Sequence, residues 1–358
     1  MTDLFIAAGG GGDPIGAALT AIAMGDGADG GPPVIATYAW ERPEVDPTPG
    51  PLGVRDFTGL VPRPEGPVLT PAARAVAPAG STLPRLAADL PVRLVLLDPH
   101  QGLAGLAEQI RRLAGALAPG PVRIVDVGGD ILTHGDEGTL CSPLPDALVL
   151  AACTLAGIHA TVHVAGAGTD GEIPQEVLLD RFGADSGACG RLTPAAGHTA
   201  AVARALSWHP SEASALFAAA VRGVRGTVAT VGRAIPLTDA SADVLGMRLA
   251  AAVEQNPVAR GLLELRPTSV DEAADLSARL TGIHEIARER GPAVPSDPAT
   301  EPFPADAHRA WERIRAMAGP ASHVTSRFAV RALGLSWRHV PDVRALLGDE
   351  GPVHALRS

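Results

Sequence analysis

Three acidic side chains in the first half of this chain follow apolar runs through glycine-rich turns. The segments FIAAGGGGDP, RIVDVGGDIL and VHVAGAGTDGE carry Asp13, Asp130 and Asp170 in this way. Glycine adopts positive φ without strain and lets a ligand approach the backbone closely. In an open parallel sheet, such turns gather at the carboxyl ends of the strands, where ligands bind. The spacing therefore predicts that the three turns form the walls of one pocket.

The first turn places Gly10, Gly11, Gly12 and Asp13 between an expected strand and an expected helix. Unpaired N–H groups at a helix N-terminus favour a phosphate or a nucleotide, and a tight structural turn is the alternative. The turn does not match the GxGxxG dinucleotide motif, and the nearest later acid, Glu41, lies past the end of the second expected strand. Phosphate binding is thus better supported than NAD binding.

The second turn, at Gly128 and Gly129, leads into residue types that bind metals or transfer protons. Asp130, His134 and Glu137 could act as catalytic groups, or as mixed oxygen and nitrogen ligands that favour magnesium over zinc. Their order matches no dedicated metal motif, and acids in a loop also serve solubility. Metal binding is therefore left open at this point.

The third turn, at Gly166 and Gly168, delivers Asp170 and Glu172. These carboxylates could accept hydrogen bonds from ligand hydroxyls or hold a metal, and Asp170 is counted with Asp130, His134 and Glu137 among the candidate catalytic groups. The alternative is a helix cap with acids in the first helical turn, where the helix dipole favours them. Both interpretations put the acids at the same edge of the sheet.

The chain contains no lysine, and this excludes two kinds of chemistry. A Walker phosphate loop needs its lysine, and pyridoxal phosphate needs a lysine Schiff base. Arginines must therefore clamp any phosphate, with Arg222 and Arg225 as the first candidates and ordinary surface arginines as the alternative. Trp40 and Glu41 begin a Pro-rich loop and are candidate ligand contacts if that loop closes over the pocket; Trp40, one of few aromatic residues, could stack on a flat ligand or belong to the core.

Composition limits the partners. Net charge is −10 and aromatic residues make up 3% of the 358 residues, which argues against a nucleic-acid binder. The three cysteines form no CxxC pair, so neither a zinc ribbon nor a disulfide framework is expected, and a reduced cytoplasmic compartment fits best. The apolar stretch 147–168 is interrupted by His159 and His163, so no membrane span is expected.

Strands alternate with helices at a spacing typical of βαβ units. This pattern predicts an α/β fold with a Rossmann-like parallel sheet, helices on both faces and a helical C-terminal extension. The expected organisation is an α/β domain over 1–293, with a Pro-rich loop at about 42–84, a linker at 294–304 and a helical appendage over 305–358. Residues 245–255 are expected to form a helix.

Several segments together resemble the DUF1152 family, a domain of unknown function. The resemblance rests on AAGGGGDPIGA, YAWERPEVDPTPGPL, IVDVGGDILTHGDEGTLCSPLPDALVLAA and GAGTDGE, which occur in that order, and it covers roughly residues 4–290. It implies a Rossmann-like fold and no nameable activity.

The sequence therefore favours an enzyme that binds a phosphorylated, nucleotide-like or sugar-like small molecule and catalyses group transfer or hydrolysis. A magnesium ion or a nucleotide is the cofactor that such a pocket would suit. The alternatives are an NAD-dependent oxidoreductase and a non-catalytic ligand-binding or scaffold protein. The Ala- and Arg-rich composition is compatible with specialised biosynthesis, and the C-terminal helices offer a contact for a homo-oligomer.

Overall fold

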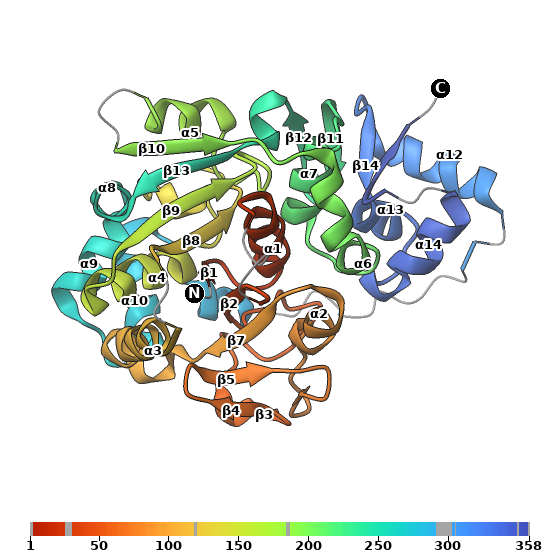
Figure 1. Cartoon of the computed structure of the whole chain (residues 1–358). Helices are drawn as coiled ribbons and strands as arrows, with labels where there is room; N and C mark the ends of the chain where they lie inside the picture. The colour runs from red at the N-terminus through yellow and green to blue at the C-terminus, as the bar shows by residue number, and fades with distance from the viewer. Residues whose placement is uncertain are drawn as a thin grey trace.

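The computed structural model describes residues 3–25, 31–117, 120–183, 187–290, 303–304, 306–348 and 351–356. Within them, a mixed sheet of nine strands forms the centre of the molecule, in the order β10-β13-β9-β8-β1-β2-β7-β5-β4 (Figure 1). The strands are β1 (Leu4–Ala7), β2 (Val34–Tyr38), β4 (Val61–Arg63), β5 (Gly66–Leu69), β7 (Arg93–Leu97), β8 (Val122–Val127), β9 (Ala160–Ala165), β10 (Ala188–Leu192) and β13 (Val244–Arg248).

The middle of the sheet is parallel, as the sequence predicted. β1 pairs in parallel with β2 and β8, β2 with β7, and β8 with β9. The chain first adds β2 and β7 on one side of β1 and then returns to add β8 and β9 on the other. This reversal creates a switch point between β1 and β8, and ligands bind outside the carboxyl ends of strands at such a point.

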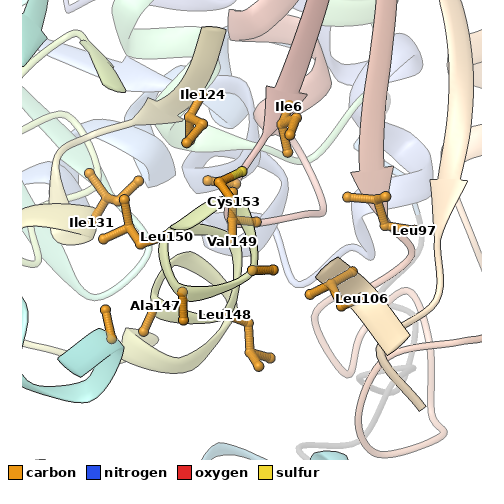
Figure 2. Packing of buried hydrophobic residues seen from close by; sticks show 14 of the residues in the cluster. Ile6, Leu97, Leu106, Ile124, Ile131, Ala147, Leu148, Val149, Leu150 and Cys153 are labelled. Carbon is orange, nitrogen blue, oxygen red and sulfur yellow. The ribbon is translucent and has the colours of Figure 1, made fainter. Parts of the chain in front are cut away.

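Helices cover both faces of the sheet, which confirms the predicted architecture. The face bearing Ile6 and Ile124 packs against α3 and α4, while the alternate residues of the same strands pack against α1 and α7 (Figures 1 and 2). The helices are α1 (Asp13–Ala23), α2 (Leu83–Asp89), α3 (Gly102–Leu117), α4 (Pro143–Ala156), α5 (Gln175–Arg181), α6 (Ala203–Leu206), α7 (Glu212–Val221), α8 (Leu249–Gln255), α9 (Pro257–Leu265), α10 (Val270–Thr281) and α11 (Glu285–Glu289).

The predicted helix at 245–255 is only half correct. Its first part is β13, which pairs antiparallel with both β9 and β10, and only Leu249–Gln255 is helical. Val244 and Met247 are buried in the sheet. A short apolar run cannot distinguish a buried strand from a buried helix, and here the pairing of the sheet decides.

The Pro-rich segment 42–84 contains more regular structure than a loop. It includes β3 (Phe57–Thr58), β4, β5, β6 (Arg74–Ala75) and the start of α2. β5 pairs antiparallel with β7, and β4 forms the outer edge of the sheet. An edge strand tolerates proline because one side of its backbone needs no ladder partner.

The C-terminal extension is helical, but it also supplies two strands that the sequence did not reveal. Its elements are α12 (Ala307–Ala318), β14 (His323–Thr325), α13 (Ser326–Ala332), α14 (Val340–Leu347) and β15 (Val353–Ala355). β14 pairs in parallel with β11 (Gly226–Thr230), giving a second sheet in the order β12-β11-β14-β15, where β12 is Arg233–Leu237 (Figure 1). Most of the predicted linker 294–304 lies outside the described residues.

No helix within the described ranges is both long and apolar enough to cross a membrane. The apolar stretch 147–168 instead divides into most of α4, a turn at Gly157, and β9. Gly157 ends α4 in the left-handed conformation that glycine adopts readily.

The packing of α1 on β8 depends on Gly16. A Cβ atom at Gly16 would lie 2.3 Å from Cγ2 of Val127. We therefore expect Gly16→Ala to lower the free energy of unfolding by about 1–3 kcal/mol through overpacking, as measured by urea denaturation. Gly115→Ala in α3 is the matched control, because beyond the adjoining backbone of α3 no atom lies within 4 Å of the added methyl group; it should raise stability by up to about 1 kcal/mol. Equal effects at the two sites would contradict this account.

Candidate functional site

A cavity of about 370 Å³ is lined by residues from all three glycine turns, at the carboxyl ends of β1, β8 and β9. Its size falls within the range of small-molecule sites. Acidic side chains far outnumber basic ones in its wall. The acids are Asp13, Glu41, Glu44, Asp126, Asp130, Asp146, Asp170, Glu172, Glu212, Glu285 and Glu289, and the arginines are Arg42, Arg233 and Arg327.

Gly9, Gly10, Gly11 and Gly12 of the first turn line the cavity. Gly10 and Gly11 have φ of 78° and 50°, so the chain reverses tightly before α1 begins. The Gly9 amide donates to Oδ2 of Asp13 at 2.8 Å. Within the described residues, the amides of Gly10, Gly11 and Gly12 donate no hydrogen bond. These donors are therefore available to a ligand.

The second and third turns interlock through two glycines. A Cβ atom at Gly128 would lie 2.2 Å from Cγ of Asp170, and the φ of 128° at Gly128 disfavours other residues as well. The Gly168 amide donates to the Gly128 carbonyl at 2.7 Å. Only glycine at position 128 allows the Asp170 carboxylate to lie against this backbone.

Glu172 ties the third turn to the N-terminus of α4. Its carboxylate accepts hydrogen bonds from the amides of Cys141 and Ser142 at 2.6 and 2.8 Å, and from the Ser142 hydroxyl at 2.7 Å. Arg42 lies 3.7 Å from the same carboxylate, and its side chain is 57% exposed. Glu172 therefore has a structural role, and Arg42 retains freedom to contact a ligand.

Glu285, at the start of α11, reaches the same edge of the sheet. Its Oε1 accepts a hydrogen bond from the Leu144 amide at 2.7 Å, and its side chain is buried. Burial, reinforced by the negative charge of Glu172, raises the pKa of Glu285 to about 8, against the opposing effects of the Leu144 amide and Arg42. This carboxyl group carries a proton at neutral pH.

Three other carboxylates meet at one point. One carboxyl oxygen from each of Asp13, Asp126 and Asp146 lies within 4.8 Å of the other two. They come from the first residue of α1, the end of β8 and the first turn of α4. Asp126 and Asp146 are almost fully buried, at 1% exposure each.

The crowding of acids perturbs their protonation. Burial raises the pKa of Asp13 and of Asp170 to about 7, with the charge of Glu172 adding to both shifts. Burial and the negative charges of neighbouring acids raise the pKa of Asp126, Asp130 and Asp146 well above the usual aspartate value. The site is therefore suited to proton transfer near neutral pH or to binding a cation.

Trp40 and Glu41 line the cavity but already have protein partners. The Trp40 indole N–H donates to Oε1 of Glu289 at 3.1 Å. Glu41 accepts from the Thr82 amide and hydroxyl, each at 2.6 Å, before the start of α2. The Thr82 hydroxyl that donates to Glu41 also accepts a hydrogen bond from His209. Nδ1 of His209 accepts from the Ser211 amide, so its Nε2 carries the proton that it donates to this hydroxyl. Glu41 is thus occupied and is not positioned to hold a ribose.

His134 and Glu137 lie outside this cavity. Glu137 accepts hydrogen bonds from Thr133, from the amides of His134 and Gly135, and from Arg181, whose guanidinium lies 2.6 Å away. His134 is exposed and borders a separate hollow of about 680 Å³ between α8 and α9. The expected set Asp130, His134 and Glu137 is therefore not brought together.

Arg222 and Arg225 are also placed elsewhere. Arg222 is exposed at the C-terminal end of α7, and Arg225 pairs with Asp239 at 2.8 Å. The arginines that do reach the cavity are Arg42, Arg233 and Arg327. The N-terminus of α7, and not the end that carries Arg222 and Arg225, faces the first turn: the Ser214 hydroxyl donates to the Gly12 carbonyl at 2.9 Å.

Sequence reasoning did not assign roles to Asp126, Asp146 or Glu285. Asp126 lies inside an otherwise apolar strand, and a buried acid in such a run is a signal in itself. Asp146 follows two prolines at the start of a helix. Glu285 and Glu289 are four residues apart in α11 and both line the cavity, but nothing in the local sequence ties them to a segment about 140 residues earlier.

The Glu137–Arg181 ion pair should make the free energy of unfolding depend on pH. The two side chains are 7% and 9% exposed. Burial alone would raise the pKa of Glu137, but hydrogen bonds from the His134 amide, Thr133 and Arg181 lower it to about 2. Because the folded pKa is depressed, the stabilisation is complete above about pH 4.5 and is lost as the pH falls toward 2.

We expect Glu137→Gln to lower the free energy of unfolding by about 3 kcal/mol at pH 7, because it leaves Arg181 buried without a counter-charge. Urea denaturation at several pH values should show this difference shrinking below pH 4.5. Asp136→Asn, at an exposed neighbouring acid, is the control and should change little. A difference that is independent of pH would contradict the assignment.

Comparison with known proteins places the chain in a family. The family model described as "Protein of unknown function (DUF1152)" matches residues 4–293. No curated protein and no solved structure matches the chain. The matched residues include every described element from β1 to α11, and with them all three glycine turns and Glu285. The chain belongs to the DUF1152 family.

Proposed function

We propose that this protein is an enzyme that binds a phosphorylated, hydroxyl-rich small molecule, such as a sugar phosphate or a nucleotide, and transfers or hydrolyses a group on it. The observation that carries the proposal is the meeting, in one cavity of about 370 Å³, of available glycine amides and buried carboxyl groups. Amides of this kind suit a phosphate, while carboxyl groups suit hydroxyls and proton transfer.

The phosphate is assigned to the first turn. The Gly10, Gly11 and Gly12 amides precede α1, whose N-terminus carries a partial positive charge. Arg42 lines the same cavity, and its side chain is more than half exposed beside Glu172, so it can contact an anion there. Arg42 takes over the role that the sequence suggested for the two arginines after α7.

The reacting part of the ligand is assigned to the second and third turns. Asp130 and Asp170 would accept hydrogen bonds from its hydroxyls. Asp170, with a pKa raised to about 7 by burial and by Glu172, is ionised in half or more of the molecules at and above that pH and can act as a base. Glu285 replaces His134 and Glu137 as the proton donor, because it lines the cavity and they do not.

An NAD-dependent oxidoreductase is less well supported. The first turn lacks the dinucleotide pattern, and Glu41 is engaged by Thr82. A non-catalytic binding protein would use the same amides but would not need a protonated Glu285. The two experiments below separate these alternatives.

Ligand binding can be tested by thermal-shift screening. Sugar phosphates, ATP, AMP and NAD would each be added with and without magnesium, and a bound ligand stabilises the fold by RT ln(1 + [L]/Kd), about 2.7 kcal/mol at a hundredfold excess over Kd. We expect a rise in melting temperature with at least one phosphorylated compound and a smaller rise with its dephosphorylated form. No rise with any compound would refute the phosphate site.

Catalysis can be tested at Glu285 once a ligand is identified. Glu285→Gln keeps an acceptor for the Leu144 amide but removes the proton, so turnover should fall by about 10²–10⁴-fold while binding persists. The rate of the wild type should decline above about pH 8, as Glu285 loses its proton, and the variant should lack this decline. Glu254→Gln, at an exposed acid outside the cavity, is the control. Unchanged turnover in Glu285→Gln would remove this residue from the mechanism.

A further inference from the structure

We propose that Asp13, Asp126 and Asp146 bind a divalent cation of the magnesium class in the wall of the acid-lined cavity. The cation site is defined by the protein's own residues. Its suggested role, to join the phosphate of a ligand to the edge of the sheet, rests on the proposed function.

The three carboxylates are held by rigid elements of the core. Asp13 begins α1, Asp126 lies near the end of the buried strand β8, and Asp146 lies in the first turn of the buried helix α4. Their oxygens lie within 4.8 Å of one another. Oxygen atoms from three separate elements thus converge on one point, as the ligands of a cation do.

One carboxyl oxygen of Asp146 is buried without a hydrogen-bond partner among the described residues. Its side chain is 1% exposed and borders the cavity, yet its Oδ1 has no hydrogen-bond partner in the part of the chain that the structure describes. A buried carboxylate oxygen without a partner is costly, because burial removes the water that would otherwise solvate it. A cation between the three aspartates would supply that missing partner.

The arginines around the cavity do not form ion pairs with the three aspartates in the described part of the chain. Among the ion pairs of the described residues, none involves Asp13, Asp126 or Asp146. Arg42 approaches Glu172, and Arg327 pairs with Glu44 and Glu212. The three acids therefore form no salt bridge within the described residues, and the charge of Arg42 acts on Asp13 only from a distance.

The donor set points to the class of cation. Three carboxylates, with no histidine or cysteine in the group, suit magnesium or manganese better than zinc or copper. Magnesium is commonly bound by one or two carboxylates together with waters and a ligand phosphate. Asp13 directly follows the Gly10–Gly12 amides, so a cation at this point lies next to the phosphate position.

The test is binding of Mn²⁺ to the full-length protein without any other ligand. Electron paramagnetic resonance distinguishes free from bound Mn²⁺, and titration with Mg²⁺ should displace it. We expect one saturable site per chain in the wild type, and at least tenfold weaker binding in Asp146→Asn. Asp13→Asn is the second variant, because its amide oxygen can still accept from Gly9 and the fold is therefore retained.

Asp136→Asn, at an exposed aspartate outside the cavity, is the control and should bind Mn²⁺ like the wild type. Absence of saturable binding to the wild type, or equal binding to both cavity variants and the wild type, would overturn the inference. Its failure is distinguishable from failure of the proposed function. Stabilisation by a phosphorylated ligand in the presence of EDTA supports the ligand site alone, whereas Mn²⁺ binding without any ligand response supports the cation site alone.

Discussion

Repulsion among buried carboxyl groups is the physical constraint on which this site depends. At least six of them belong to one cavity wall, and burial gives each a reason to stay neutral. Backbone N–H groups offset part of this electrostatic cost. Glu172 and Glu285 accept hydrogen bonds from amides at the start of α4, and Asp13 accepts one from the Gly9 amide. What the backbone does not offset must be met by protons or by a positively charged ligand.

The glycine turns let neighbouring segments lie closer to the turn backbone than a side chain at these positions would allow. Gly128 brings Asp170 against the backbone of the second turn, and Gly12 leaves room for Ser211, whose Oγ would lie 2.1 Å from a Cβ at that position. Two helices and two strand ends can therefore approach one point. The same closeness that makes the acids repel one another also makes them a concentrated set of oxygen donors.

The sequence predicted the parts of the fold that local pattern controls. Buried strands followed by glycine turns and helices identified β1, β8 and β9, and adjacency at the carboxyl edge followed from the topology of parallel sheets. Patterns that depend on distant partners were missed. β13 was taken for the start of a helix because its partners, β9 and β10, are not evident from its own residues.

The candidate site divides in the same way. Asp13, Asp130 and Asp170 were identified from their turns, whereas Glu285 reaches the cavity from α11 and is tied to the start of α4 by its hydrogen bond with the Leu144 amide. Glu137 and His134 show the converse error. They are close in sequence to Asp130, but the turn at Thr133 directs them away, and Arg181 fixes Glu137 there. Closeness in sequence to Asp130 therefore did not place His134 and Glu137 in the same cavity, because the chain turns at Thr133.

The pairing of β14 with β11 has a consequence for the order of events during synthesis. Arg327, which follows β14, contributes to the wall of the cavity and bridges Glu44 and Glu212. A ribosome releases the glycine turns long before residue 327, and domains generally begin to fold from the N-terminal side. This part of the cavity wall is therefore missing until a segment outside the family-matched residues 4–293 has been synthesised. The cavity is complete only after β14 and the residues that follow it have been made, late in the synthesis of the molecule.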